Sequence, residues 1–133
     1  MMKRTTAWLE FADRDLEAAK KLVNYEYLAN IVIFHSQQCV EKCLKAILEE
    51  HNQNFPKIHG VTKFYELARK NTNISLPISD DELDLVDNVN IDTRYPANFG
   101  LLPSGFPTKD GATSLISIAK KVYQSTINEL KQS

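Results

Sequence analysis

Residues 27–50 form the longest stretch of helical apolar periodicity in the chain, and this stretch constrains the fold more than any other feature. With about 100° of rotation per residue, its apolar side chains cover more than half of the helix circumference. A band this broad indicates burial against more than one neighbouring helix. We therefore expect a central helix from about Tyr27 to Glu50. Its apolar members are Leu28, Val32, Ile33, Cys39, Val40, Cys43, Leu44, Ala46, Ile47 and Leu48.

Four other segments repeat apolar residues at spacings of three and four, and no segment alternates as a strand does. They cover about the first 25 residues, about 61–70, about 80–95, and a last segment from 108 almost to the end. In the first, the apolar residues are Trp8, Phe11, Ala12, Leu16, Ala19, Leu22 and Val23. We expect a single all-α domain over residues 1–133, an up-and-down bundle of four to five helices, three long and two short.

Capping residues mark the expected helix ends. Thr5 or Thr6 can cap the first helix, and Thr108 can cap the last. Ser79 followed by Glu82 matches a capping box. The fourth helix should end near residue 95, because a residue that precedes proline avoids helical geometry.

The charge balance narrows the classes of function. Sixteen basic and seventeen acidic residues give a net charge of −1, so no overall excess of charge indicates nucleic acid or an anionic membrane. No apolar run approaches the roughly 20 residues that cross a bilayer, and the N-terminus lacks the apolar core of a signal peptide. We expect a cytoplasmic protein without a membrane partner. Cys39 and Cys43, four residues apart on one helix, should be reduced thiols.

The central helix also carries a polar strip, defined here as His35, Gln38, Glu41, Lys42 and Lys45, within an arc of about 120°. The strip is either the outer edge of the bundle or the lining of a groove. Glu41 and Lys45 form a structural i,i+4 pair in one interpretation. In another, the two ammonium groups bind a phosphate or the acidic residues of a partner.

A metal site is a third interpretation of this helix, because His35, Cys39 and Cys43 repeat every four residues. No paired ligand motif occurs elsewhere, and isolated cysteines usually pack as small apolar residues. We therefore predict no metal and no cofactor, with both thiols in the core.

Asp15 breaks the apolar pattern of the first segment, since it shares a helix face with Trp8 and Leu22. It is either a carboxylate at the edge of the apolar stripe, paired with water or with a lysine of a neighbouring helix, or a carboxylate turned into a groove of the bundle. The first interpretation is the simpler one.

Four groups of residues, in this order, carry a resemblance. They are A-x-x-D-L-x-x-A at residues 12–19, F-H-S-Q-Q-C-V-E-K-C-L-K-A at 34–46, His59, and R-Y-P at 94–96. The series resembles the HEPN (higher eukaryotes and prokaryotes nucleotide-binding) domain family, in its small stand-alone prokaryotic form. The resemblance implies a helical bundle, commonly a homodimer, often encoded beside a minimal nucleotidyltransferase. It also implies nucleotide binding and, in many branches, RNA cleavage in toxin–antitoxin or defence systems.

The ribonuclease branches of that family use an arginine followed closely by a histidine. Here the histidines are His35, His51 and His59, and none follows Arg94. Arg94 can supply a cation for a phosphate, or form an ion pair with Asp15, Asp87 or Asp92. The candidates for catalysis are therefore only Arg94, Tyr95 and His59. Tyr95 has an ordinary phenol pKa that makes it a poor base, and His59 can equally bond local backbone at a helix start.

The leading hypothesis is a domain that binds a nucleotide or RNA phosphate and works with a minimal nucleotidyltransferase, for example in a toxin–antitoxin-type pair. No glycine-rich phosphate loop is present, so side chains must hold the ligand. One alternative is a metal-independent endoribonuclease toxin, and another is a non-catalytic interaction module that uses residues 96–107. The expected ligand-binding residues are Asp15, Gln38, Glu41, Lys42, Lys45 and Arg94.

Overall fold

A computed structural model describes residues 1–55, 60–92 and 108–131. Every regular element in these ranges is helical, which confirms the all-α fold. None of the helices in these ranges combines the length and the hydropathy that a membrane span requires. The elements are α1 (Lys3–Leu22), a short 3₁₀ helix η1 (Glu26–Leu28), α2 (Ala29–Glu50), α3 (Val61–Asn71), α4 (Asp80–Asp92) and α5 (Lys109–Lys131).

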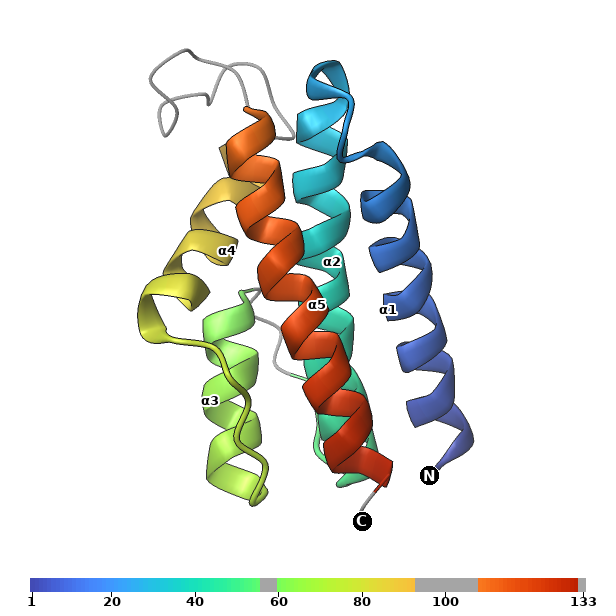
Figure 1. The fold of residues 1–133 in the computed structure, drawn as a ribbon. Coiled ribbons are helices and arrows are strands. Elements are labelled where there is room, and N and C mark those ends of the chain that lie inside the picture. The colour runs from blue at the N-terminus through green and yellow to red at the C-terminus, as the bar shows by residue number, and fades with distance from the viewer. Residues whose placement is uncertain (56–59, 93–107, 132–133) are drawn as a thin grey trace.

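The helix α2 lies at the centre of the bundle, as its broad apolar band predicted. It packs most extensively against α1 and α5 and also contacts α3 and α4. Of its 22 residues, Asn30 is the only exposed one. Figure 1 shows α1 running antiparallel to α2, whereas α2, α3 and α5 run in the same direction and end at one end of the bundle.

Two of the predicted caps are confirmed. The Ser79 hydroxyl accepts the Glu82 N–H at 3.1 Å, and the Glu82 carboxylate accepts the Ser79 N–H at 3.0 Å, which completes the capping box. The Thr108 hydroxyl accepts the N–H of Gly111 at 3.0 Å and so caps α5.

The predicted cap of α1 is wrong. This helix begins at Lys3, and the residue before it makes no side-chain cap. Thr5 instead donates its hydroxyl to Glu50 at the far end of α2, at 2.8 Å, and Thr6 donates to the Met2 carbonyl at 3.2 Å. A long-range partner has therefore replaced the local cap that the sequence suggested.

A carboxylate from α4 positions the start of α3. Asp87 accepts the Val61 N–H at 2.6 Å, and the Thr62 N–H and hydroxyl at 3.2 and 2.6 Å. These bonds satisfy orphan donors that the first turn of a helix always has. Gly60, just before the helix, has a positive φ of 135° that other residues rarely adopt.

Candidate functional site

Asp15 joins the first two helices through a pair of polar contacts. One carboxylate oxygen lies 2.7 Å from His35 Nδ1, and the other accepts a hydrogen bond from Lys42 Nζ at 2.5 Å. His35 and Lys42 are seven residues apart, so both point from one face of α2. Asp15 therefore pairs with a lysine of a neighbouring helix, which was the simpler of the two interpretations.

The cluster of Asp15, His35 and Lys42, called here the seam cluster, is partly open to solvent. The exposed fractions of the three side chains are 11%, 30% and 23%. A carboxylate only accepts hydrogen bonds, so a neutral His35 places its proton on Nδ1 and leaves Nε2 as an acceptor. The seam cluster thus combines an ammonium group with a ring nitrogen that can take a proton.

An exposed aromatic ring lies beside the seam cluster. Phe11, one helical turn before Asp15, is 51% exposed, although its spacing placed it in the apolar pattern of α1. The guanidinium of Arg14 lies 5.5 Å from its ring centroid, and the ammonium of Lys42 lies 6.0 Å from it. An exposed ring with two cations nearby can stack on a nucleobase while the cations contact phosphate.

Lys45 is enclosed by aromatic rings. Its Nζ lies 5.1 Å from the ring centroid of Trp8, 5.6 Å from that of Phe64 and 5.9 Å from that of Phe55. The carboxylate of Glu41, a residue only 9% exposed, lies 3.7 Å away. The Glu41–Lys45 pair expected from the sequence is therefore present, inside an aromatic surround.

The polar strip is not an outer edge of the bundle: His35 and Lys42 contact α1, and Lys45 lies between rings of α1 and α3. All five of its residues are buried or half-buried. Gln38 donates its amide to the side chain of Gln37 at 2.6 Å, and Gln37 is only 2% exposed. Of the two alternatives left open by the sequence, the outer edge is therefore wrong, because the strip is packed between helices.

The cysteines of α2 belong to the core. Cys39 and Cys43 are free thiols with no exposed surface. The hydrogen bond with Cys43, together with burial, raises the pKa of Cys39 far above its ordinary value. His35 turns to Asp15 instead. Among the described residues, no group of three or more His, Cys, Asp or Glu side chains could hold a metal ion.

Three predicted candidates lie outside the described residues: Arg94, Tyr95 and His59. The same holds for the Arg94–Asp15 pair and for the proposed interface at 96–107. In contrast, His35 was placed from the sequence in the polar strip and weighed as a metal ligand, and its contact with Asp15 was not predicted. The signal that could have found it is its position within the F-H-S-Q-Q motif, two turns before Lys42.

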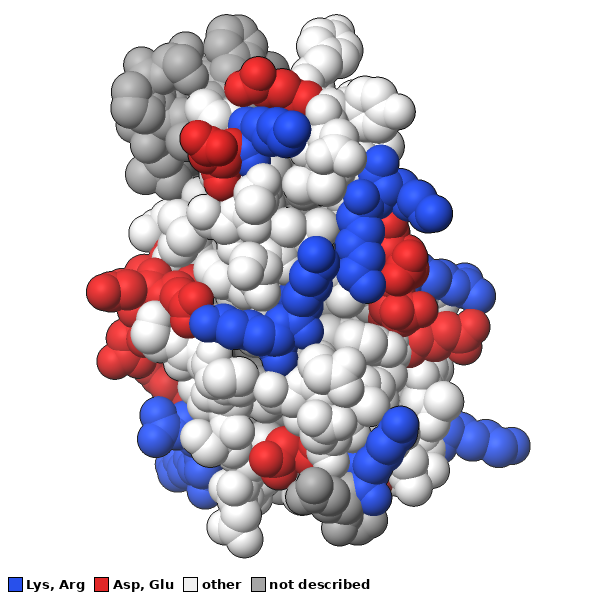
Figure 2. Space-filling view, in the orientation of Figure 1, with Lys and Arg blue, Asp and Glu red and all other residues white. Residues whose placement is uncertain are grey.

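Charge is distributed locally and not as a broad basic face. Figure 2 shows basic and acidic side chains interleaved over α1. In α1, the exposed Arg14 pairs with Glu10 at 3.0 Å and Lys20 pairs with Glu17 at 3.2 Å. This side of the molecule therefore offers individual charged groups, such as those of the seam cluster, and not a broad basic face.

These features define an all-α helical-bundle domain with a polar seam between its first two helices. The family model of the HEPN domain matches residues 5–130, and the chain belongs to this family. Two solved structures are similar: TT1696 from Thermus thermophilus, with a TM-score of 0.74, and ST0689, described as an archaeal HEPN homologue, with a TM-score of 0.67. Each is 22% identical, over 96% of this chain and 98% of its own chain, and shows the fold alone. No curated protein gives a significant match.

Proposed function

We propose that this HEPN domain binds a nucleotide or an RNA phosphate at the seam between α1 and α2. The observation that carries the proposal is the exposed ring of Phe11, whose centroid lies within 6.0 Å of the cations of both Arg14 and Lys42. A base stacks on the ring, and the phosphate accepts hydrogen bonds from the two cations. Arg94, which belongs to the family motif, adds a third cation in this proposal.

Asp15 and the strip residues Gln38, Glu41 and Lys45 have supporting roles in this proposal. Asp15 fixes the position of Lys42, and the Gln37–Gln38 contact and the Glu41–Lys45 pair hold the adjacent turns of α2. A cation whose position is already fixed loses less conformational entropy when it binds phosphate. The compensating disadvantage is repulsion between the Asp15 carboxylate and the ligand, which argues for modest affinity.

Calorimetric titration with AMP, ADP and ATP tests the proposal. We expect saturable binding to the unaltered protein, and affinity at least about tenfold weaker in Phe11→Ala and Lys42→Met. Asp15→Asn should bind more tightly, because it removes the repelling charge and keeps the shape. Lys20→Met is the matched control, since its exposed ammonium pairs with Glu17 on the same helix. Equal affinity in all variants, or no heat at millimolar nucleotide, would contradict the proposed site.

We also propose that the domain acts as a homodimer with a minimal nucleotidyltransferase, in a toxin–antitoxin-type pair. Membership of the HEPN family supports this assembly. Light scattering after size exclusion should give twice the mass of one 15.2 kDa chain. Co-expression with a small nucleotidyltransferase from a neighbouring reading frame should yield a complex that survives purification. A monomer that does not co-purify with the transferase would favour the alternative of an interaction module that binds another partner.

Metal-independent RNA cleavage is the second candidate function, and the His35–Asp15 contact favours it. A carboxylate on Nδ1 orients an imidazole so that Nε2 can take a proton, which is the role of a general base. Labelled RNA should then be cut in the presence of EDTA, and His35→Ala and Arg94→Ala should each abolish cleavage. Cleavage that neither substitution alters would point to a contaminating nuclease and reject this candidate.

A further inference from the structure

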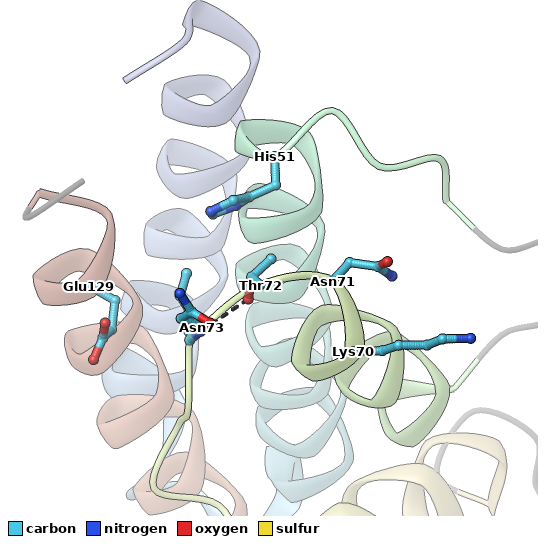
Figure 3. Close-up of a pocket in the computed structure, with 7 residues that line it drawn as sticks. His51, Lys70, Asn71, Thr72, Asn73 and Glu129 are labelled. Atoms are coloured by element: carbon cyan, nitrogen blue, oxygen red, sulfur yellow. Dashed lines mark hydrogen bonds between the residues drawn. The ribbon is translucent and has the colours of Figure 1, made fainter.

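A hollow lies at the end of the bundle where α2 terminates. Its volume is about 560 Å³, which is within the range of small-molecule sites. The residues that line it are His51, Glu129 and the segment 70–74, which includes Lys70 (Figure 3). His51 follows Lys42 by nine residues, or about 14 Å of helical rise, so this hollow is separate from the seam cluster.

Three helices point their C-terminal ends at this hollow. The helices α2, α3 and α5 run in the same direction and finish together (Figure 1). His51 and Thr72 are the C-caps of α2 and α3, and Glu129 lies in the last turn of α5. Several of the final carbonyl groups of α2 and α3 accept local hydrogen bonds. The aligned peptide dipoles still place partial negative charge at the C-terminal end of each helix, so this end of the bundle favours a cation.

The side chains that face the hollow are mostly hydrogen-bond acceptors. His51 Nδ1 lies 2.9 Å from the Ile47 carbonyl, which accepts its proton and leaves Nε2 of the neutral ring as an acceptor. The side chains of Glu129 and Asn73 make no hydrogen bond or ion pair with any other residue in the described ranges. In Figure 3 the His51 ring points towards the side where Glu129 lies, whereas the Lys70 and Asn71 side chains point away.

We propose that this hollow binds an organic cation, specifically an alkyl amine or polyamine. The Glu129 carboxylate, His51 Nε2 and the Asn73 carbonyl would accept hydrogen bonds from an ammonium group, and Ile74 offers apolar contact to its alkyl chain. A resident metal ion fits less well, because His51 and Glu129 are the only lining side chains of the types that usually bind one. The described residues contain no group of three or more His, Cys, Asp or Glu side chains that could hold a metal.

Titration with spermidine at physiological salt, followed by calorimetry or amide chemical shifts, tests this inference. The expected result is one saturable site per chain, with shifts at residues 51, 72–74 and 129. Glu129→Gln should weaken binding by about tenfold or more, because it removes the one carboxylate of the site. His51→Ala should also weaken binding, by a smaller factor.

Glu66→Gln is the matched control. It also removes one carboxylate, but from the exposed face of α3, where Glu66 is 64% exposed and pairs with Lys63. It should leave spermidine affinity unchanged. Lys42→Met should also leave it unchanged, because Lys42 belongs to the proposed nucleotide site, so failure of the spermidine proposal is distinguishable from failure of the nucleotide proposal. Equal weakening by Glu129→Gln and Glu66→Gln, or binding that never saturates, would show nonspecific charge attraction and overturn the proposal. Circular dichroism should show that Glu129→Gln remains folded.

Discussion

The Asp15–Lys42 contact allows a quantitative test of how the seam contributes to stability. Lys42→Met keeps the unbranched side chain and removes the ammonium group, so Asp15 loses one of its two partners. Hydrogen bonds to charged groups contribute about 1.5–3 kcal/mol. Removing one partner of a fully buried ion pair costs about 3–5 kcal/mol. Lys42 is 23% exposed and His35 still contacts the carboxylate, so we expect a loss of about 2 kcal/mol.

Urea unfolding followed by circular dichroism at helical wavelengths measures this loss. With a urea slope of about 2 kcal/mol per molar, the midpoint should fall by about 1 M at unchanged slope. In a double-mutant cycle with Asp15→Asn, the loss of unfolding free energy in the double variant should be smaller than the sum of the two single losses by about 1 kcal/mol. Lys20→Met is the control, because exposed pairs contribute about 1 kcal/mol or less. Strict additivity in the cycle, or an equal effect of Lys20→Met, would refute the reasoning.

Three further predictions concern the other side of the bundle, and urea unfolding measures each of them. Gly60→Ala should lower the free energy of unfolding by about 1–3 kcal/mol, because alanine is strained at the φ of 135° found there. Steric crowding is not the cause, since the added Cβ would lie at an ordinary contact distance of 3.5 Å from the Asp87 carboxylate. Asp87→Ala should cost about 1–2 kcal/mol, since the Val61 N–H loses its acceptor at the start of α3. The Glu82 pKa is lowered below its ordinary 4.5, first by the hydrogen bond from Lys121, so its stabilising contribution is present above pH 4.5 and is lost as the pH falls through the folded pKa. Glu82→Gln should therefore flatten the loss of stability below pH 4.5, and an unchanged acid profile would contradict this assignment.

Helix ends could be predicted wherever a cap and its acceptor lie close together in sequence. The Thr108 cap acts across three residues, as does the Ser79–Glu82 capping box, so both follow from local chemistry. The prediction failed at Thr5, whose hydroxyl bonds Glu50 from 45 residues away. Local patterns contain no information on such a partner.

The seam cluster required knowledge of how two helices are rotated against each other. Asp15 is 20 residues from His35 and 27 from Lys42, so their contacts depend on the faces that α1 and α2 present. The sequence placed Asp15 on the apolar face of the first helix, where a carboxylate is unexpected, and Lys42 on a polar strip of the central helix. It could not show that the two meet. Phe11 illustrates the opposite error, because its spacing fits the apolar pattern while half of its surface is exposed.

Asp15 links the stability of the seam to the proposed binding of phosphate, with opposite signs. As a carboxylate it anchors Lys42 and joins α1 to α2, so its neutralisation should lower the free energy of unfolding. The same charge repels an incoming phosphate, so Asp15→Asn should raise affinity under our proposal. If the role of Asp15 is purely structural, Asp15→Asn should lower the stability of the protein without raising its affinity for phosphate. Unfolding and nucleotide binding measured on this one variant therefore separate two cases. Asp15 is either part of a structural ion pair only, or part of a binding site in which its charge stabilises the seam and weakens phosphate binding.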